Sequence, residues 1–98
     1  MDQNREDRPR MPTANTQYHA MSLALKEDKP IMLDYWSDSV EGSCLIGIKD
    51  NNEKLLVKSE EEYTSPITKI FKVESEYIII TENSIYITHE KVKTRRIS

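Results

Sequence analysis

The residues whose types most clearly suggest chemistry lie at positions 29–44, in the run KPIMLDYWSDSVEGSC. In this run an apolar stretch is followed by an aromatic pair and then by a cysteine. A thiol redox site after such a strand needs two cysteines two residues apart at a helix N-terminus, because the helix end and the second thiol stabilise the attacking thiolate. Here Trp36 is followed by Ser-Asp-Ser, and Cys44 is the only cysteine. The sequence therefore predicts no thiol redox chemistry, and the aromatic pair is interpreted as part of the core or its rim.

The other chemistry-bearing residues form no site that the sequence reveals. An enzyme would need Asp34, His89 and Cys44 to converge in space, and no pattern indicates that they do. His19 and His89 share no metal-ligand spacing with another side chain, and two glycines are too few for a phosphate-binding loop. The βαβ order of a thioredoxin-like domain is also missing, because the pattern after Cys44 predicts hairpins. We expect a non-enzymatic protein with no cofactor and no metal.

Composition limits the classes of partner. The 98 residues fit one small domain, and 37% apolar residues in clear clusters are enough for a core. A net charge of -3 argues against a nucleic-acid binder with a broad basic face, since such binding depends on Lys and Arg at phosphates. The chain starts without an apolar signal segment, and its longest apolar run is YIII. We expect a soluble intracellular protein with no membrane partner.

Three regions are predicted along the chain. Residues 1–15 are interpreted as a flexible charged arm, residues 16–90 as a single small β domain with an N-terminal helix, and residues 91–98 as a basic tail. The helix is predicted to start with Thr16 as its N-cap and to stop before Pro30.

The predicted helix is amphipathic. Tyr18, Met21 and Leu25 lie on one helical stripe, with Leu23 and Ala24 close to it.

After Pro30 the apolar pattern has the period of strands. The hairpin loop DNNE at 50–53 joins two of them as an antiparallel pair, and the short connections ESE and ENS leave only a meander for the last three. In YIIIT both faces are apolar, which predicts a strand buried on both sides, whereas SIYIT reads as half exposed. The predicted strands lie at 31–36, 43–49, 54–59, 67–73, 76–81 and 84–90.

These elements predict a mainly β (α+β) fold. It would be a small antiparallel β-barrel or meander of about six strands with one N-terminal helix.

Two functions from different classes fit this outline. The first is a non-enzymatic protein–protein interaction or assembly module, whose charged arms and open strand edges, SIYIT or IMLDYW, contact other protein subunits, either further copies or different proteins. The alternative is a small nucleic-acid-binding barrel, in which aromatic side chains, including Tyr77, stack on bases and the basic cluster holds phosphates. The candidate contact residues are Tyr35, Trp36, Tyr63, Tyr86, Lys91, Lys93, Arg95 and Arg96.

One further indication comes from a resemblance. The run KLLVKSEEEYTSPITKIFKVESEYIIITENSIYIT, with the earlier LDYW, resembles small uncharacterised or virion-linked proteins of large eukaryotic DNA viruses. The likeness covers roughly residues 30–88 and attaches no chemistry to any of them. It implies a structural or host-interaction role, in the host cytoplasm or in the virion.

Overall fold

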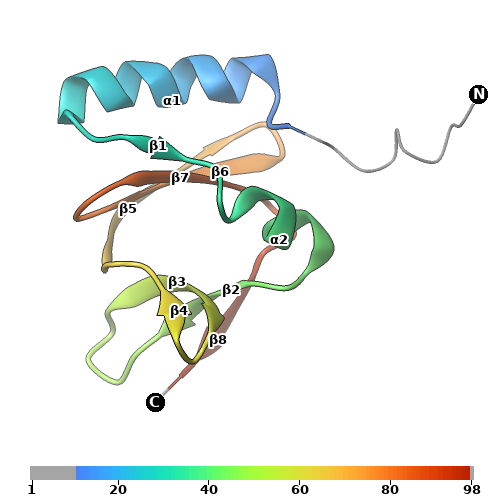
Figure 1. Ribbon diagram of the computed structural model, residues 1–98, viewed down its shortest axis with the longest axis vertical. Coiled ribbons are helices and arrows are strands. Elements are labelled where there is room, and N and C mark those ends of the chain that lie inside the picture. The colour runs from blue at the N-terminus through green and yellow to red at the C-terminus, as the bar shows by residue number, and fades with distance from the viewer. Residues whose placement is uncertain (1–10, 98) are drawn as a thin grey trace, which may run out of the picture.

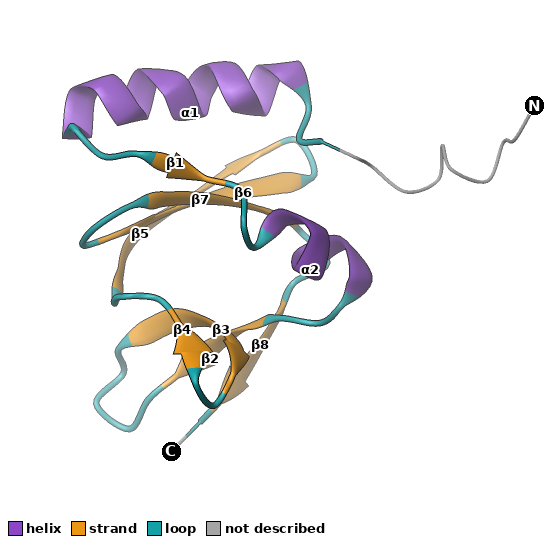
Figure 2. Ribbon diagram, in the orientation of Figure 1, coloured by secondary structure: helices purple, strands orange, loops and turns teal. Residues whose placement is uncertain are grey.

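The computed structural model describes residues 11–97 and folds them into two helices and two four-stranded sheets (Figure 2). The helices are α1 (Ala14–Glu27) and α2 (Trp36–Glu41). The strands are β1 (Ile31–Met32), β2 (Leu45–Ile48), β3 (Lys54–Ser59), β4 (Glu62–Tyr63), β5 (Ile67–Val73), β6 (Glu76–Thr81), β7 (Ile85–His89) and β8 (Lys93–Arg96).

Both sheets are mixed. Sheet A has the order β1-β7-β6-β5, in which β5, β6 and β7 form an antiparallel meander and β1 adds in parallel to β7. Sheet B has the order β4-β3-β2-β8, in which β2 and β3 form an antiparallel hairpin and β8 adds in parallel to β2. The predicted hairpin over residues 50–53 and the predicted meander are therefore confirmed.

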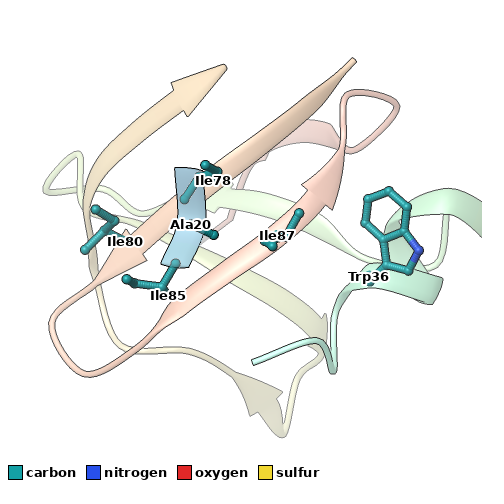
Figure 3. Packing of buried hydrophobic residues seen from close by; sticks show 6 residues of the cluster. All are labelled: Ala20, Trp36, Ile78, Ile80, Ile85 and Ile87. Atoms are coloured by element: carbon teal, nitrogen blue, oxygen red, sulfur yellow. The ribbon is translucent and has the colours of Figure 1, made fainter. Parts of the chain in front are cut away.

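The elements stack in layers, with α1 across one face of sheet A and sheet B against the other face (Figure 1). The first core lies between the helices and sheet A. In Figure 3 the four isoleucines of β6 and β7 surround Ala20 of α1, and Trp36 lies to one side of them. Each fully buried isoleucine contributes roughly 1.5–3 kcal/mol to folding. The members of this core are Ala20, Trp36, Ile78, Ile80, Ile85 and Ile87.

The second core lies between the two sheets. Ile79 of sheet A packs there with Ile46 and Leu56 of sheet B. Because Ile78 and Ile80 belong to the first core and Ile79 to the second, β6 is buried on both faces, as its sequence predicted. Strand β7 is buried on both faces as well, so its predicted half-exposed face is wrong.

A buried carboxylate holds the start of α1 on sheet A. Thr13 is the N-cap, and its side-chain oxygen accepts a hydrogen bond from the backbone N–H of Thr16. Glu76 accepts from the backbone N–H of Thr13 at 3.2 Å, from the Thr13 hydroxyl at 3.0 Å and from the Thr16 hydroxyl. The predicted cap at Thr16 is therefore wrong by three residues, because Thr16 is needed inside the helix to reach Glu76. Asp28 ends the helix in the left-handed conformation, at φ 57°.

Three other predictions about the fold need correction. Neither sheet closes into a barrel, and residues 11–97 form eight strands and two helices instead of about six strands and one helix. The predicted strand at 31–36 keeps only Ile31 and Met32, because the chain turns and enters α2 at Trp36. Helix α2 ends at Gly42, whose φ of 79° is a left-handed conformation that glycine adopts without strain.

The ends of the domain also differ from the predicted regions. The helix begins at Ala14, inside the predicted arm 1–15, and residues 1–10 of that arm lie outside the described residues. Lys93–Arg96, assigned to a basic tail, form β8. Ile97 follows with its side chain over Gly47, where a Cβ atom would lie 2.6 Å from the Ile97 Cδ1 atom. Glycine at position 47 thus leaves room for the chain after β8 to pack on sheet B.

Candidate interaction surfaces

The aromatic residues proposed as contacts divide into buried and exposed ones. Tyr35 and Trp36 are 4% and 3% exposed, and Tyr86 is half-buried. The Tyr35 and Tyr86 rings meet edge to face at 5.4 Å between centroids. Burial raises the pKa of both tyrosine hydroxyls above the usual range. Trp36 is part of the first core and Tyr35 is part of the second. Neither ring is accessible for stacking by a partner or a base.

The three residues that an enzyme would have needed make separate contacts. The Cys44 thiol is buried and points at the Tyr35 carbonyl, 4.0 Å away, and this burial raises its pKa to about 11. The His89 ring packs against Trp36, and its Nδ1 atom accepts from the backbone N–H of Lys91. Asp34 is exposed. Within residues 11–97, His, Cys, Asp and Glu side chains do not gather in a group of three that could hold a metal ion.

The most unusual surface is the outer face of α1. Tyr18, Met21 and Leu25 lie near one another and are among the largest apolar residues of the helix. They are nevertheless 68%, 58% and 86% exposed. The face of α1 that packs on sheet A contains Thr16 and Ala20, which are buried, and the partly buried Leu23. The helix thus buries Thr16 and Ala20 fully and Leu23 in part, and it exposes three of its four largest apolar side chains.

We call Ala14, Tyr18, Met21 and Leu25 the α1 stripe. Their spacings of four, three and four residues place them on one side of the helix, in the pattern of a helix that packs along another helix. A stripe of this kind normally packs on the protein's own core. The sequence predicts the stripe but not whether it faces sheet A or solvent. The hydrogen bonds from Thr13 and Thr16 to Glu76 decide this, because they fix the rotation of α1 about its own axis.

A second exposed surface is basic. Strand β8 lies at the end of sheet B, and all four of its residues are exposed, among them Lys93, Arg95 and Arg96. Lys91 is exposed in the turn before it. In the described part of the chain, none of these four cations forms an ion pair with an acidic side chain, and the Arg96 guanidinium donates a hydrogen bond to the Lys49 carbonyl, at 3.5 Å. The predicted basic cluster is therefore an ordered strand edge.

The outer face of sheet B also carries a cup of about 850 Å³. The residues that line it include Leu55 and Val57 of β3, Tyr63, Pro66 and Ile97. Tyr63 is 60% exposed. Of the aromatic residues proposed as contacts, Tyr63 alone has a largely free ring.

Strand β5 is another end strand, on the side of sheet A opposite β1. Ile70 and Phe71 are 39% and 41% exposed on it. Two lysines interrupt this apolar strand: Lys69 pairs with Glu27 at 3.8 Å, and Lys72 pairs with Glu90 at 3.1 Å. Charged side chains on an edge strand oppose pairing with a second sheet edge.

The chain matches no protein-family model, no curated protein and no solved structure. Neither helix of residues 11–97 has the length and apolar character needed to cross a bilayer.

Proposed function

We propose that the protein is a non-enzymatic protein–protein interaction module that docks through the α1 stripe, and that its partner there is a second copy of the same chain. The observation that carries the proposal is the exposure of Tyr18, Met21 and Leu25, at 68%, 58% and 86%. Three large apolar side chains aligned on one helix face gain free energy from any contact that removes them from water.

The residues beside the stripe support self-association. The positions that flank it on α1 are Asn15, Gln17, Ser22 and Ala24, none of which carries a charge. These four positions of α1 therefore add no like-charge repulsion between two copies, whereas helices that select a different partner usually do so through charges at these positions. Residues 1–10 are a poor occupant of an apolar seam, because six of their side chains are charged.

The size of the stripe supports a weak dimer. Burying one large apolar side chain contributes about 1.5–3 kcal/mol, so six of them in two copies contribute about 9–18 kcal/mol. Association costs about 4–15 kcal/mol in lost translational and rotational freedom. The helix is 14 residues long, which gives a seam shorter than a standard interface. We expect a reversible dimer with a Kd of about 10 µM to 1 mM.

The test is a charge placed in the seam. Met21→Glu puts two carboxylates into the contact between the copies and should weaken the dimer at least about 30-fold, because an unpaired buried charge costs about 2 kcal/mol or more. His19→Glu is the matched control, since it adds the same charge at an exposed position of α1 that is not among the four of the stripe, where the His19 ring meets the Tyr18 ring, at 6.1 Å between centroids.

Molar mass is measured by light scattering and sedimentation across the expected range of Kd, and folding of each variant is checked by circular dichroism. A wild-type protein that stays monomeric at the highest concentration contradicts the proposal. So does a His19→Glu variant that weakens the dimer as much as Met21→Glu.

A role in assembly extends the proposal. The resemblance to small proteins of large eukaryotic DNA viruses supports a structural or host-interaction role, in the virion or the host cytoplasm. Co-purification of the protein with intact particles, lost in the Met21→Glu variant and kept in His19→Glu, is the result that this extension predicts.

A further inference from the structure

Strand β8 has main-chain hydrogen-bonding groups that face away from its own sheet. It pairs with β2 on one side and is the last strand of sheet B. The N–H of Ile97 donates to the Ile48 carbonyl at 2.8 Å. The N–H and C=O groups of successive residues point to opposite sides of a strand. Those of Lys93 and Arg95 therefore also point toward β2, and those of Thr94 and Arg96 point outward. Two donors and two acceptors are thus presented at this edge.

The same edge concentrates positive charge. In the pairing of β8 with β2, Lys93 lies beside Leu45 and Arg95 lies beside Gly47. The side chains of Lys93 and Arg95 therefore extend from the same face of sheet B as these two residues, and that of Arg96 extends from the opposite face. The whole chain has a net charge of -3, so this edge is a basic region on an acidic protein. Because its cations have no acidic side-chain partner within residues 11–97, they are free to pair with acidic groups from outside.

We propose that β8 is a docking edge for an extended acidic segment of another protein, which adds to sheet B as a fifth strand. The outward groups of Thr94 and Arg96 bond its main chain, and Lys93, Arg95 and Arg96 pair with its Asp or Glu side chains on both faces. This site is separate from the α1 stripe and does not depend on the dimer.

Two other occupants fit the edge less well. A second copy paired through its own β8 would set Lys93, Arg95 and Arg96 against identical cations, and like charges on adjacent strands repel. A single-stranded nucleic acid would use the cations and leave the main-chain groups unused. Trp36 and Tyr35, the residues best suited to stack its bases, are buried.

The first experiment measures binding of a fluorescent peptide of about eight residues in which pairs of glutamates alternate with pairs of valines, so that an extended strand carries glutamates on both faces. A matched peptide carries N-methyl groups on alternate amides, so that it keeps every charge and loses one edge of main-chain donors. We expect the methylated peptide to bind at least about tenfold more weakly, because two or more hydrogen bonds are lost. Equal binding of the two peptides would overturn the proposal.

The second experiment changes the protein at Thr94. Thr94→Pro removes an outward N–H and keeps the bonds to β2, since proline is accepted on an edge strand where its nitrogen faces solvent. It should weaken peptide binding about fivefold or more, whereas Thr94→Val should change it less than about twofold. Lys93→Glu with Arg95→Glu should weaken it at least about tenfold.

Backbone amide NMR spectra establish that each variant is folded and report which residues the peptide contacts. Slowed hydrogen exchange at Thr94 and Arg96 on peptide binding supports the added strand. If shifts appear without slowed exchange there, or if Thr94→Pro binds like wild type while single-stranded RNA of equal charge binds more tightly than the peptide, β8 is a general polyanion site and the proposal fails.

Discussion

Replacing Glu76 by glutamine tests how α1 is oriented on sheet A. Glu76 is 2% exposed, and its carboxylate accepts hydrogen bonds from the Thr13 N–H, the Thr13 hydroxyl and the Thr16 hydroxyl. Hydrogen bonds to a charged group contribute about 1.5–3 kcal/mol each, about twice the neutral value. A negative charge at a helix N-terminus adds about 0.3–1 kcal/mol.

Glutamine keeps one acceptor oxygen in nearly the same place and loses the charge. We therefore expect Glu76→Gln to lower the free energy of unfolding by about 1–2 kcal/mol. Glu76→Ala leaves the buried Thr16 hydroxyl without its acceptor and opens a cavity, so its expected cost is about 3 kcal/mol.

The assay is urea unfolding at neutral pH, with the protein dilute enough to be monomeric, because dimer formation would add its own stability. Glu74→Gln is the control. Its carboxylate lies two residues away and also reaches α1, accepting from the Asn15 amide at 3.0 Å, but this contact is exposed and should contribute less than about 0.5 kcal/mol. If Glu76→Gln destabilises the protein no more than Glu74→Gln, the buried network does not hold the helix and the reasoning is refuted.

Three further predictions concern pH, solubility and a helix end. Burial raises the pKa of the Cys44 thiol from 9.0 to about 11. The unfolded chain then binds fewer protons than the folded one in this window, so stability should fall by up to about 2 kcal/mol as pH rises from 9 to 11, and Cys44→Ala should lack that component in urea titrations. Replacing Lys69 and Lys72 of β5 by valine should promote aggregation measured by light scattering, while the control replacement of Lys49 and Lys91, which lie outside the strands, by valine should not. Asp28→Gly should raise the thermal unfolding midpoint by the equivalent of about 0.5–1 kcal/mol, because glycine adopts its left-handed conformation without strain, and an unchanged or lower midpoint contradicts this.

Local patterns in the sequence determined the elements whose partners are close in the chain. The hairpin over residues 50–53 and the β5-β6-β7 meander follow from short connections, which allow few alternative pairings. The burial of β6 on both faces follows from the unbroken run Ile78–Ile80, since a half-exposed strand would alternate. The single cysteine was equally decisive for one prediction, because these 98 residues cannot contain a two-cysteine motif whatever the fold.

Contacts between distant parts of the chain decided the rest. The run IMLDYW has strand-like residues, yet most of it leaves the sheet, because Trp36 and Tyr35 reach the two different cores from the start of α2. The basic segment after Val92 reads as a solvated tail and becomes a strand only because β2, far back in the sequence, offers it a parallel edge. A parallel partner leaves no turn signal in the sequence.

The outward face of α1 shows most clearly what the sequence and the tertiary structure each decided. Its sequence determined that Tyr18, Met21 and Leu25 share one stripe, since the helical period fixes which residues are neighbours. Only the tertiary structure decided that this stripe faces outward. Glu76 comes from a strand 60 residues after Thr16, and its buried carboxylate needs the polar start of the helix, so the helix turns Thr16 and Ala20 inward and leaves its apolar side exposed.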